Sequence, residues 1–295
     1  MGFCVSATLT EKAPAKINLT LRVLGRRADG YHELESLVAF AGVADTLTLQ
    51  TGSEIGLRIT GPFASKTGSA ADNLVLKALT ALQRRVPDLK AGRFLLEKNI
   101  PVAAGIGGGS TDAAATLRLL ARANNIVPDD PLLASTALAV GADVPVCLDP
   151  VPRIMRGVGE LLSRPLELPV LPALLVNPGV PVVTRDVFGK FSGVQGGSNL
   201  ANVPREFDAL VEWLKHHGND LTAAASACVP AITEVLAVLS TLRGVKLARM
   251  SGSGATCFAL FGSRGEAAAA MERLKGEQRD WWVCDTTIGP VMARA

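Results

Sequence analysis

The spacing of apolar and polar residues along the chain predicts a succession of strands and helices. Two segments alternate apolar and polar residues with a period of two, which is typical of antiparallel strands: Asp45–Gln50 and Leu57–Ile59. After Asp72, which we expect to cap a helix, apolar residues recur at helical spacing as far as Pro87. The apolar face of this helix is formed by Val75, Leu79, Leu82 and Val86.

Further elements follow around a glycine-rich stretch. A strand predicted at Arg93–Lys98 leads into this stretch, and a helix rich in Ala and Leu leaves it at Ala113–Ala123. Another helix, Pro131–Val140, should end at Gly141. In the second half we expect strands at Ala173–Val176, Lys246–Met250 and Cys257–Phe261, helices near Pro204–His217, Pro230–Leu242 and Arg264–Lys275, and a final strand after Trp281.

The order of these elements is mixed and does not follow a regular strand–helix repeat. Three prolines and two glycines between Gly157 and Pro172 interrupt the pattern and indicate a domain boundary. We therefore expect one domain at residues 1–160 and another at 161–282, with a last strand, about 283–295, that returns to the first domain. The segment Ser192–Ser198 is the most linker-like, and we expect it to form a mobile loop.

The composition narrows the class of protein. With 48% hydrophobic and 19% charged residues among 295, the chain can fill a sizeable core and is not expected to be disordered. A net charge of +3 is too small to indicate binding to nucleic acid or a membrane. Five scattered cysteines without CxxC spacing argue against a zinc site and a disulfide framework. No apolar run reaches the length of a signal-peptide core or a membrane span, so we expect a soluble, cytoplasmic protein.

The stretch from Pro101 to Asp112 carries the clearest chemistry. It contains four glycines within five residues, then the hydroxyls of Ser110 and Thr111, and then a helix. Glycines let the backbone approach a ligand closely, and the free N–H groups and dipole at a helix start favour a phosphate. Either hydroxyl can donate to a phosphate oxygen or help to hold Mg²⁺. The stretch therefore predicts a phosphate-binding loop.

Other interpretations of the loop fit less well. A Walker loop is excluded, since GxxxxGK[ST] does not occur in the chain. As a dinucleotide fingerprint, Gly105-x-Gly107 is followed by Ser110 where a glycine or alanine is needed, and the expected acidic residue after a second strand is missing. A plain turn that only caps the helix remains open, although four glycines would be costly for that purpose.

The loop PVAAGIGGGSTDAA resembles the glycine-rich nucleotide motif of the GHMP kinases, with Ile106 and Thr111 replacing a usual Leu and a common Ser. Other segments narrow the resemblance to the diphosphocytidyl-methylerythritol kinases, in whose order they occur between about residue 13 and residue 261. These segments are Ala13–Leu19 (APAKINL), Gly25–Leu34 (GRRADGYHEL), Gly141–Pro145 (GADVP), Gly218–Leu221 (GNDL) and Met250–Thr256 (MSGSGAT).

This resemblance implies an α+β fold of two domains, the N-terminal one like domain 2 of ribosomal protein S5 and the C-terminal one a ferredoxin-like α/β domain, with ATP and substrate between them. It also implies Mg²⁺-dependent transfer of the ATP γ-phosphoryl group to the 2-hydroxyl of diphosphocytidyl-methylerythritol, in the non-mevalonate isoprenoid route. Lys16 and Asp143 would be the catalytic pair, with Asp143 as the base. Taken alone, Lys16 could be a solvated strand-edge lysine and Asp143 a turn residue.

The resemblance further implies binding residues. ATP would contact the loop and two residues near the adenosine: Pro101, Val102, Ala103, Ala104, Gly105, Ile106, Gly107, Gly108, Gly109, Ser110, Thr111, Asn73 and Lys98. The substrate would contact Asn18, Tyr31, His32, Asp143, Thr184 and Phe188, with Tyr31 and His32 on the cytosine and Phe188 as a second stacking face. A third motif would close over the phosphates: Ser251, Gly252, Ser253 and Gly254. Without the resemblance, Tyr31 could be a turn aromatic and the third motif a hairpin with a wide turn.

Two rival functions remain at this point. Another GHMP kinase, such as a homoserine or mevalonate kinase, would share the loop, but it would have no use for an aromatic residue that binds a base. A nucleotide-binding regulatory module without catalysis would not need both Lys16 and Asp143. The sequence leaves the oligomeric state open.

Overall fold

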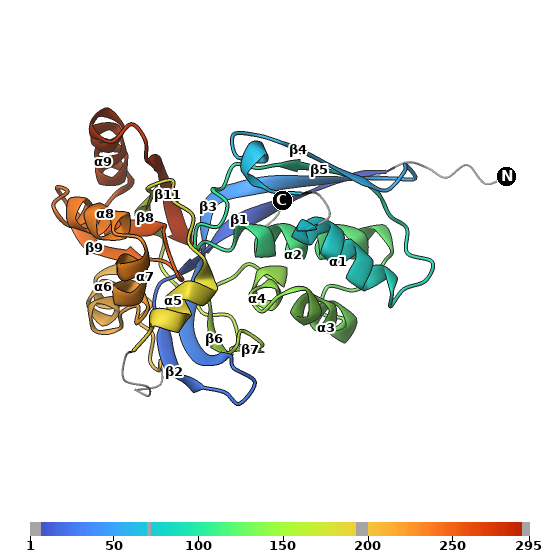
Figure 1. Cartoon of the computed structure of the whole chain (residues 1–295), viewed down its shortest axis with the longest axis horizontal. Coiled ribbons are helices and arrows are strands. Elements are labelled where there is room, and N and C mark those ends of the chain that lie inside the picture. Colours follow the sequence, from blue (N-terminus) through green and yellow to red (C-terminus); the bar gives the residue numbers. More distant parts are fainter. Residues whose placement is uncertain (1–6, 70–71, 193–199, 291–295) are drawn as a thin grey trace. The chain divides into compact units, whose positions relative to one another are not determined.

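The computed structural model describes residues 7–69, 72–192 and 200–290. The chain forms two compact units that interleave along the sequence (Figure 1). The first unit comprises Met1–Ala15, Val43–Val102 and Gly107–Asp149, and the second unit comprises Lys16–Gly42, Ala103–Ile106 and Pro150–Ala295. The glycine-rich stretch is thus shared by the two units. Of the linker-like segment Ser192–Ser198, residues 193–198 lie outside the described residues.

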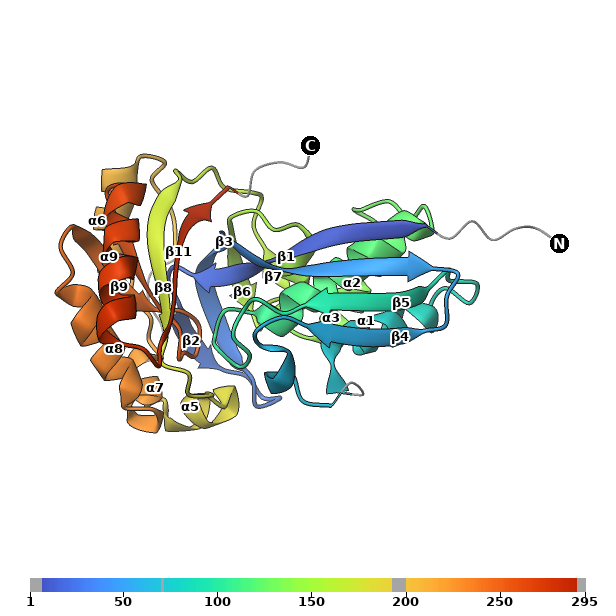
Figure 2. The same ribbon diagram turned by 90° about the horizontal axis from the view of Figure 1, so that it is seen from above.

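In the first unit, helices lie on one face of a sheet (Figure 2). The strands follow the order β4–β5–β3, and β1 also pairs with β3. Their bounds are β1 Thr8–Asn18, β3 His32–Thr51, β4 Gly56–Thr60 and β5 Gly92–Glu97. The helices are the 3-10 turn η1 Ala64–Lys66, α1 Leu74–Gln83, α2 Gly108–Ala123, α3 Pro131–Val140 and α4 Val144–Leu148. The core between sheet and helices is apolar and includes Leu47, Leu49, Phe94, Leu96, Leu117 and Leu120.

Several predicted elements of this unit are confirmed, and three details are wrong. The strand β4 pairs with β5 in parallel, not antiparallel, because α1 lies between them and returns the chain to the same end of the sheet. The cap of α1 is Asn73, whose Oδ1 accepts a hydrogen bond from the N–H of Val75 at 3.0 Å, and not Asp72. The helix also ends at Gln83, before Val86.

The second unit is built on antiparallel strands in the order β3–β11–β8–β10–β9. Its strands are the first part of β3, β2 Arg22–Arg26, β6 Arg153–Gly157, β7 Leu161–Leu162, β8 Leu171–Asn177, β9 Val245–Met250, β10 Cys257–Phe261 and β11 Trp282–Gly289. Its helices are α5 Thr184–Lys190, α6 Phe207–His216, α7 Thr222–Cys228, α8 Ala231–Ser240 and α9 Arg264–Glu277. Helices α8 and α9 pack on the sheet and bury a core that includes Leu174, Val176, Ile232, Val235 and Leu274.

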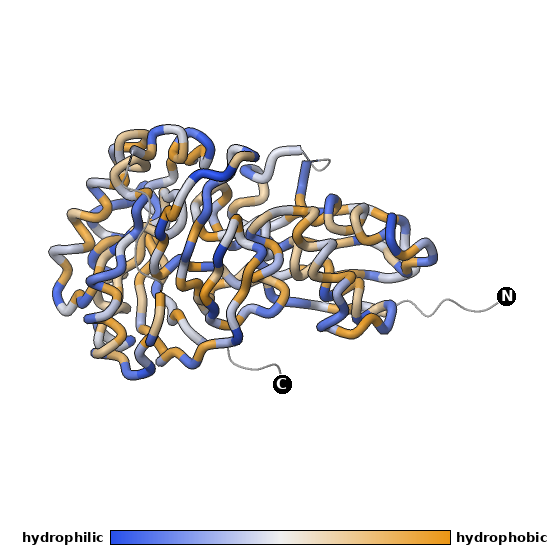
Figure 3. Tube along the Cα trace, turned by 90° about the horizontal axis from the view of Figure 1, so that it is seen from below, coloured by the Kyte–Doolittle hydropathy of each residue, from blue (hydrophilic) through white to orange (hydrophobic). Residues whose placement is uncertain are grey.

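The division of the sequence at residues 160 and 282 stays a prediction. The strand expected at the C-terminal end is present as β11, which pairs along its length with β8 and, at Ile288 and Gly289, with β3. Apolar and polar positions are interspersed throughout the described chain (Figure 3). Among the described residues, no helix combines the length and the apolar character that crossing a membrane requires.

Candidate active site

The start of α2 offers the first unit's clearest anion-binding group. The N-cap residue Gly107 has a positive φ of 65° and carries no side chain that could accept a hydrogen bond from the first turn. The first N–H groups of a helix have no acceptor within the helix, so those after Gly107 are free to bind an anion that the helix dipole also favours. This is the arrangement expected of a phosphate-binding loop, and it is centred on Gly107, Gly108 and Gly109.

The two hydroxyls of the loop differ in environment. Thr111 is 1% exposed, and its Oγ1 donates a hydrogen bond to the carbonyl oxygen of Gly108 at 2.9 Å. Ser110 is only partly buried. Ser110 is therefore the better placed of the two to meet a ligand.

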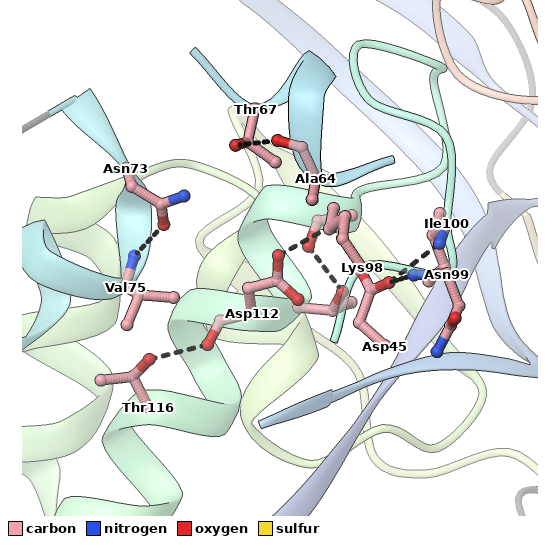
Figure 4. Close-up of polar contacts among 12 residues, drawn as sticks. Asp45, Ala64, Thr67, Asn73, Val75, Lys98, Asn99, Ile100, Asp112 and Thr116 are labelled. Atoms are coloured by element: carbon pink, nitrogen blue, oxygen red, sulfur yellow. Dashed lines mark hydrogen bonds and ion pairs between the residues drawn. The ribbon is translucent and has the colours of Figure 1, made fainter. Parts of the chain in front are cut away.

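Beneath the first turns of α2 lies a buried cluster of one ammonium and two carboxylates (Figure 4). Lys98, just after β5, donates to Asp45 of β3 and, at 2.7 Å, to Asp112 of α2. Burial alone would lower the pKa of Lys98, but the attraction of Asp112 and Asp45 outweighs it and raises that pKa. Burial raises the pKa of Asp112 to about 7, against the attraction of Lys98 and with a contribution from Asp45. Sequence reasoning missed Asp45 and Asp112, because neither shows a local pattern that sets it apart.

Three other residues of the first unit are predicted site residues: Asn73, Lys98 and Asp143. The side-chain oxygen of Asn73 accepts the hydrogen bond that caps α1. The next residue, Leu74, lies against Gly109 at the start of α2. Asp143 is partly buried and precedes α4, and its side chain does not cap that helix. Lys98 is 3% exposed and bound to two carboxylates, so a direct contact of its ammonium with adenosine stays a prediction.

In the second unit, the first half of the glycine-rich loop packs backbone to backbone against the third motif. Gly105 has a φ of +74°, and a Cβ added there would lie 2.4 Å from the carbonyl oxygen of Gly254. Gly252 is equally constrained, since its Cβ would lie 2.7 Å from the carbonyl oxygen of Gly105. The Ser251 hydroxyl donates to the same Gly105 oxygen at 3.1 Å. The structure therefore brings together two of the segments that the sequence singles out.

The side chain of Asn219 binds the backbone of the third motif. Its side-chain Nδ2 donates to the carbonyl oxygens of Met250 and Gly252, at 2.9 and 2.8 Å, and Asn219 is 8% exposed. Its neighbour Asp220 accepts hydrogen bonds from the N–H of Val23 and from Arg22. The family motif GNDL (Gly218–Leu221) does not by itself indicate a role. The structure gives it one, which is to support the loop.

Two residues of the N-terminal motif converge on the same segments. Asn18, at the end of β1, is 1% exposed; its N–H donates to the Ser251 hydroxyl and its Nδ2 to the Ser36 hydroxyl. The other side-chain atom, Oδ1, is buried without a hydrogen-bond partner among the described residues. Lys16 is 3% exposed, and its backbone N–H donates to the carbonyl oxygen of Ile106 at 3.0 Å. Both predicted residues thus flank the glycine-rich loop in the second unit.

The predicted base-binding residues also come together in the second unit. The rings of His32 and Phe188 are stacked, with centroids 4.8 Å apart and planes inclined by 23°. Tyr31 beside them is 63% exposed. Burial, and secondarily the nearby charge of Arg26, lowers the pKa of His32 and so favours its neutral imidazole. Thr184, which begins α5, hydrogen-bonds the hydroxyl of Ser253 in the third motif at 3.0 Å.

The two residues predicted to be catalytic fall in different units, Lys16 in the second and Asp143 in the first. Their meeting stays a prediction. Among the described residues there is no group of three or more His, Cys, Asp or Glu side chains that could hold a metal ion.

The fold and the loop define a class of small-molecule kinase, and comparison with known proteins bears this out. Residues 73–149 match the N-terminal domain of the GHMP kinases, and residues 199–279 match the C-terminal domain. A curated relative from Rhodopseudomonas palustris (strain BisB5), named 4-diphosphocytidyl-2-C-methyl-D-erythritol kinase, is 53% identical over 286 residues, covering 93% of this chain and 97% of the relative. A relative of the same name from Bradyrhizobium diazoefficiens is 54% identical, with 95% and 98% covered.

A solved structure agrees. A crystal structure of 4-(cytidine 5'-diphospho)-2C-methyl-D-erythritol kinase superposes with a TM-score of 0.78 at 35% identity, covering 96% of this chain and all of the other. The chain belongs to the 4-diphosphocytidyl-2-C-methyl-D-erythritol kinase family of the GHMP superfamily. The expected two-domain α+β fold is confirmed with it.

Proposed function

We propose that the chain transfers the γ-phosphoryl group of ATP to the 2-hydroxyl of 4-diphosphocytidyl-2-C-methyl-D-erythritol, in the non-mevalonate route to isoprenoid precursors. The observation that carries the proposal is the start of α2, where no side chain caps the N–H groups that follow Gly107. The chain is also 53% identical to a kinase named for this substrate. The stacked rings of His32 and Phe188, with Tyr31 beside them, support a nucleotide base as part of the acceptor.

The chemistry follows from these groups. The N–H groups at the start of α2 would bind the phosphates of ATP and stabilise the negative charge on the group being transferred. The acceptor hydroxyl attacks the γ-phosphorus, the bond to the β-phosphate oxygen breaks, and ADP leaves. In this proposal Asp143 takes the hydroxyl proton, and Lys16 keeps Asp143 ionised or lowers the pKa of the hydroxyl.

We also propose that Mg²⁺ accompanies ATP. Its preferred ligands are oxygens, and the hydroxyl of Ser110, partly exposed in the first turn of α2, fits that preference better than the buried hydroxyl of Thr111. When bound, the ion would neutralise phosphate charge. A cytoplasmic location, expected from the odd number of cysteines and the lack of a long apolar run, stays a prediction.

Replacing the base tests the proposal. Asp143→Asn should lower turnover with the cytidine substrate by about 10²–10⁴-fold, because the amide cannot accept the proton, while ATP affinity changes little. Kinetics with coupled detection of ADP and calorimetric ATP binding measure the two effects separately. A suitable control is Asp130→Asn, since Asp130 caps α3 and asparagine caps equally well.

The rival functions give different results in the same assay. Turnover of homoserine or mevalonate in place of the cytidine substrate would support another GHMP kinase. ATP binding without turnover of any of the three acceptors would support the regulatory module. Near-normal turnover by Asp143→Asn would remove that residue from the base role.

A further inference from the structure

Lys98, Asp45 and Asp112 form a buried cluster of ionisable side chains next to the glycine-rich loop. The three side chains are at most 4% exposed, and Lys98 binds both carboxylates. Taking charged groups out of water costs several kcal/mol per ion, and buried ion clusters are often no more stabilising than apolar side chains of the same volume. The cluster therefore need not add to the free energy of unfolding, but it does fix the positions of the segments that it joins.

Asp45 fixes the backbone that leads into the glycine-rich loop. Asp45 Oδ1 accepts hydrogen bonds from the N–H groups of Asn99 and Ile100, at 2.5 and 2.8 Å (Figure 4). These two residues directly precede Pro101, where the loop begins. The backbone of Lys98 is itself held, since its N–H donates to Thr60 and its carbonyl oxygen accepts from Phe63.

Asp112 ties the helix that follows the loop to the same ammonium. Asp112 lies in the second turn of α2 and binds the Lys98 ammonium at 2.7 Å. The ammonium also lies under the very start of the helix, because a Cβ added to Gly108 would be only 3.1 Å from Lys98 Nζ. A single ammonium thus joins the strand before the loop to the first two turns of the helix after it.

We propose that Lys98, Asp45 and Asp112 are positioning residues for the nucleotide. By fixing the spacing between the chain that enters the loop and the helix that leaves it, they hold the N–H groups at the start of α2 in the arrangement that phosphate requires. This inference rests on the proposed kinase function. It gives Lys98 a role that acts through the loop, in place of the direct contact with adenosine.

Nucleotide binding without acceptor tests the inference. The proteins are the full chain and its variants Lys98→Met, Asp112→Asn and the double variant, titrated with ATP by calorimetry well below their melting temperatures. Lys98→Met should weaken ATP binding about tenfold or more, and Asp112→Asn should weaken it several-fold. The double variant should lose less than the product of the two single losses, because both changes break one network. In steady-state kinetics, KM for ATP should rise while KM for the acceptor stays unchanged.

A matched control separates positioning from general stability. Glu11 forms a buried ion pair with Arg118, which is on the same helix α2 and in the same unit, at 3.1 Å. Glu11→Gln removes a buried charge of the same kind but lies away from the loop. It should lower the melting temperature and leave ATP affinity as in the wild type.

Other results would overturn the inference. If Asp112→Asn binds ATP like the wild type, the cluster does not act through the helix; this holds even if Lys98→Met fails to fold. If Lys98→Met loses ATP binding by the same factor with and without Asp112→Asn, Lys98 is a direct ligand. A wild type that binds ATP but does not phosphorylate the cytidine substrate would refute the proposed function and leave this inference standing.

Discussion

At the scale of single residues, the charge state of Asp112 should make stability depend on pH. Burial raises its pKa to about 7, although the attraction of Lys98 opposes the rise. A free aspartate titrates near ~3.9, so between about pH 4 and pH 7 the native state keeps a proton that the unfolded chain has released. The free energy of unfolding should therefore fall as the pH rises through this window, by up to about 1.4 kcal/mol per pH unit.

Asp112→Asn isolates this effect, because the amide keeps the shape of the side chain and does not titrate. From about pH 5 to about pH 8 the variant should gain stability relative to the wild type, as measured by urea unfolding of both proteins. Parallel pH profiles for the two proteins would show that Asp112 is ionised throughout and that its burial is fully compensated.

Residue types around the loop could be predicted from the sequence, but their partners could not. Lys98 is a candidate because it lies shortly before the loop, yet its two carboxylates lie 53 and 14 positions away. Such pairing depends on how β3, β5 and α2 pack, which no local pattern encodes. By contrast, Tyr31, His32 and Phe188 were found through family motifs, and the stacking of His32 on Phe188 is consistent with the expectation that they act together.

At the scale of elements, the close approach of two glycine turns should make Gly105→Ala disruptive. The new Cβ would lie 2.4 Å from the Gly254 carbonyl oxygen and 2.7 Å from that of Ser251, and both obstacles are backbone. The third motif must then move, in addition to the strain of a φ of +74° at alanine. We expect a loss of about 2–4 kcal/mol in the free energy of unfolding, measured by denaturant titration.

Gly179→Ala provides the matched control for this loss. Gly179 has nearly the same φ, +77°, in the same unit, but its nearest neighbour would be 3.7 Å from the new Cβ, an ordinary contact. It should cost only the backbone strain, about 1 kcal/mol. Equal losses in the two variants would mean that the packing of the two turns contributes nothing beyond glycine's conformational freedom.

Elements with signals at both ends were predicted best. The helix α3 spans Pro131–Val140 as expected, because Asp130 caps it, proline occupies its first position and Gly141 ends it. The direction of β4 was predicted wrongly, since alternation shows that a strand exists but not which way its neighbour runs. The short helix α5, which carries Phe188, has no such signals and was not predicted.

At the scale of the whole molecule, the interleaving of the two units was beyond the reach of sequence patterns. A shift in composition can mark a boundary between contiguous domains, but here the chain passes between the units several times. The glycine-rich loop itself is divided, with Ala103–Ile106 in the second unit and Gly107 onward in the first.

This division predicts that two different nucleotides stabilise the molecule through different residues. The rings of His32 and Phe188, which are predicted to bind the base, lie in the second unit, and the start of α2 lies in the first. A ligand at a hundred times its dissociation constant adds about 2.7 kcal/mol to the free energy of unfolding, which raises the melting temperature by a few degrees. Both ADP and cytidine diphosphate should produce such a shift in a thermal melt, whereas mevalonate and homoserine should not.

Phe188→Ala distinguishes the two sites in that experiment. The variant should melt at a lower temperature because it loses the stack with His32, but the comparison is between its melts with and without ligand. It should keep the shift produced by ADP and lose most of the shift produced by cytidine diphosphate. If cytidine diphosphate shifts both proteins equally, the rings do not bind the base; if it shifts neither and mevalonate does, the acceptor belongs to another GHMP kinase.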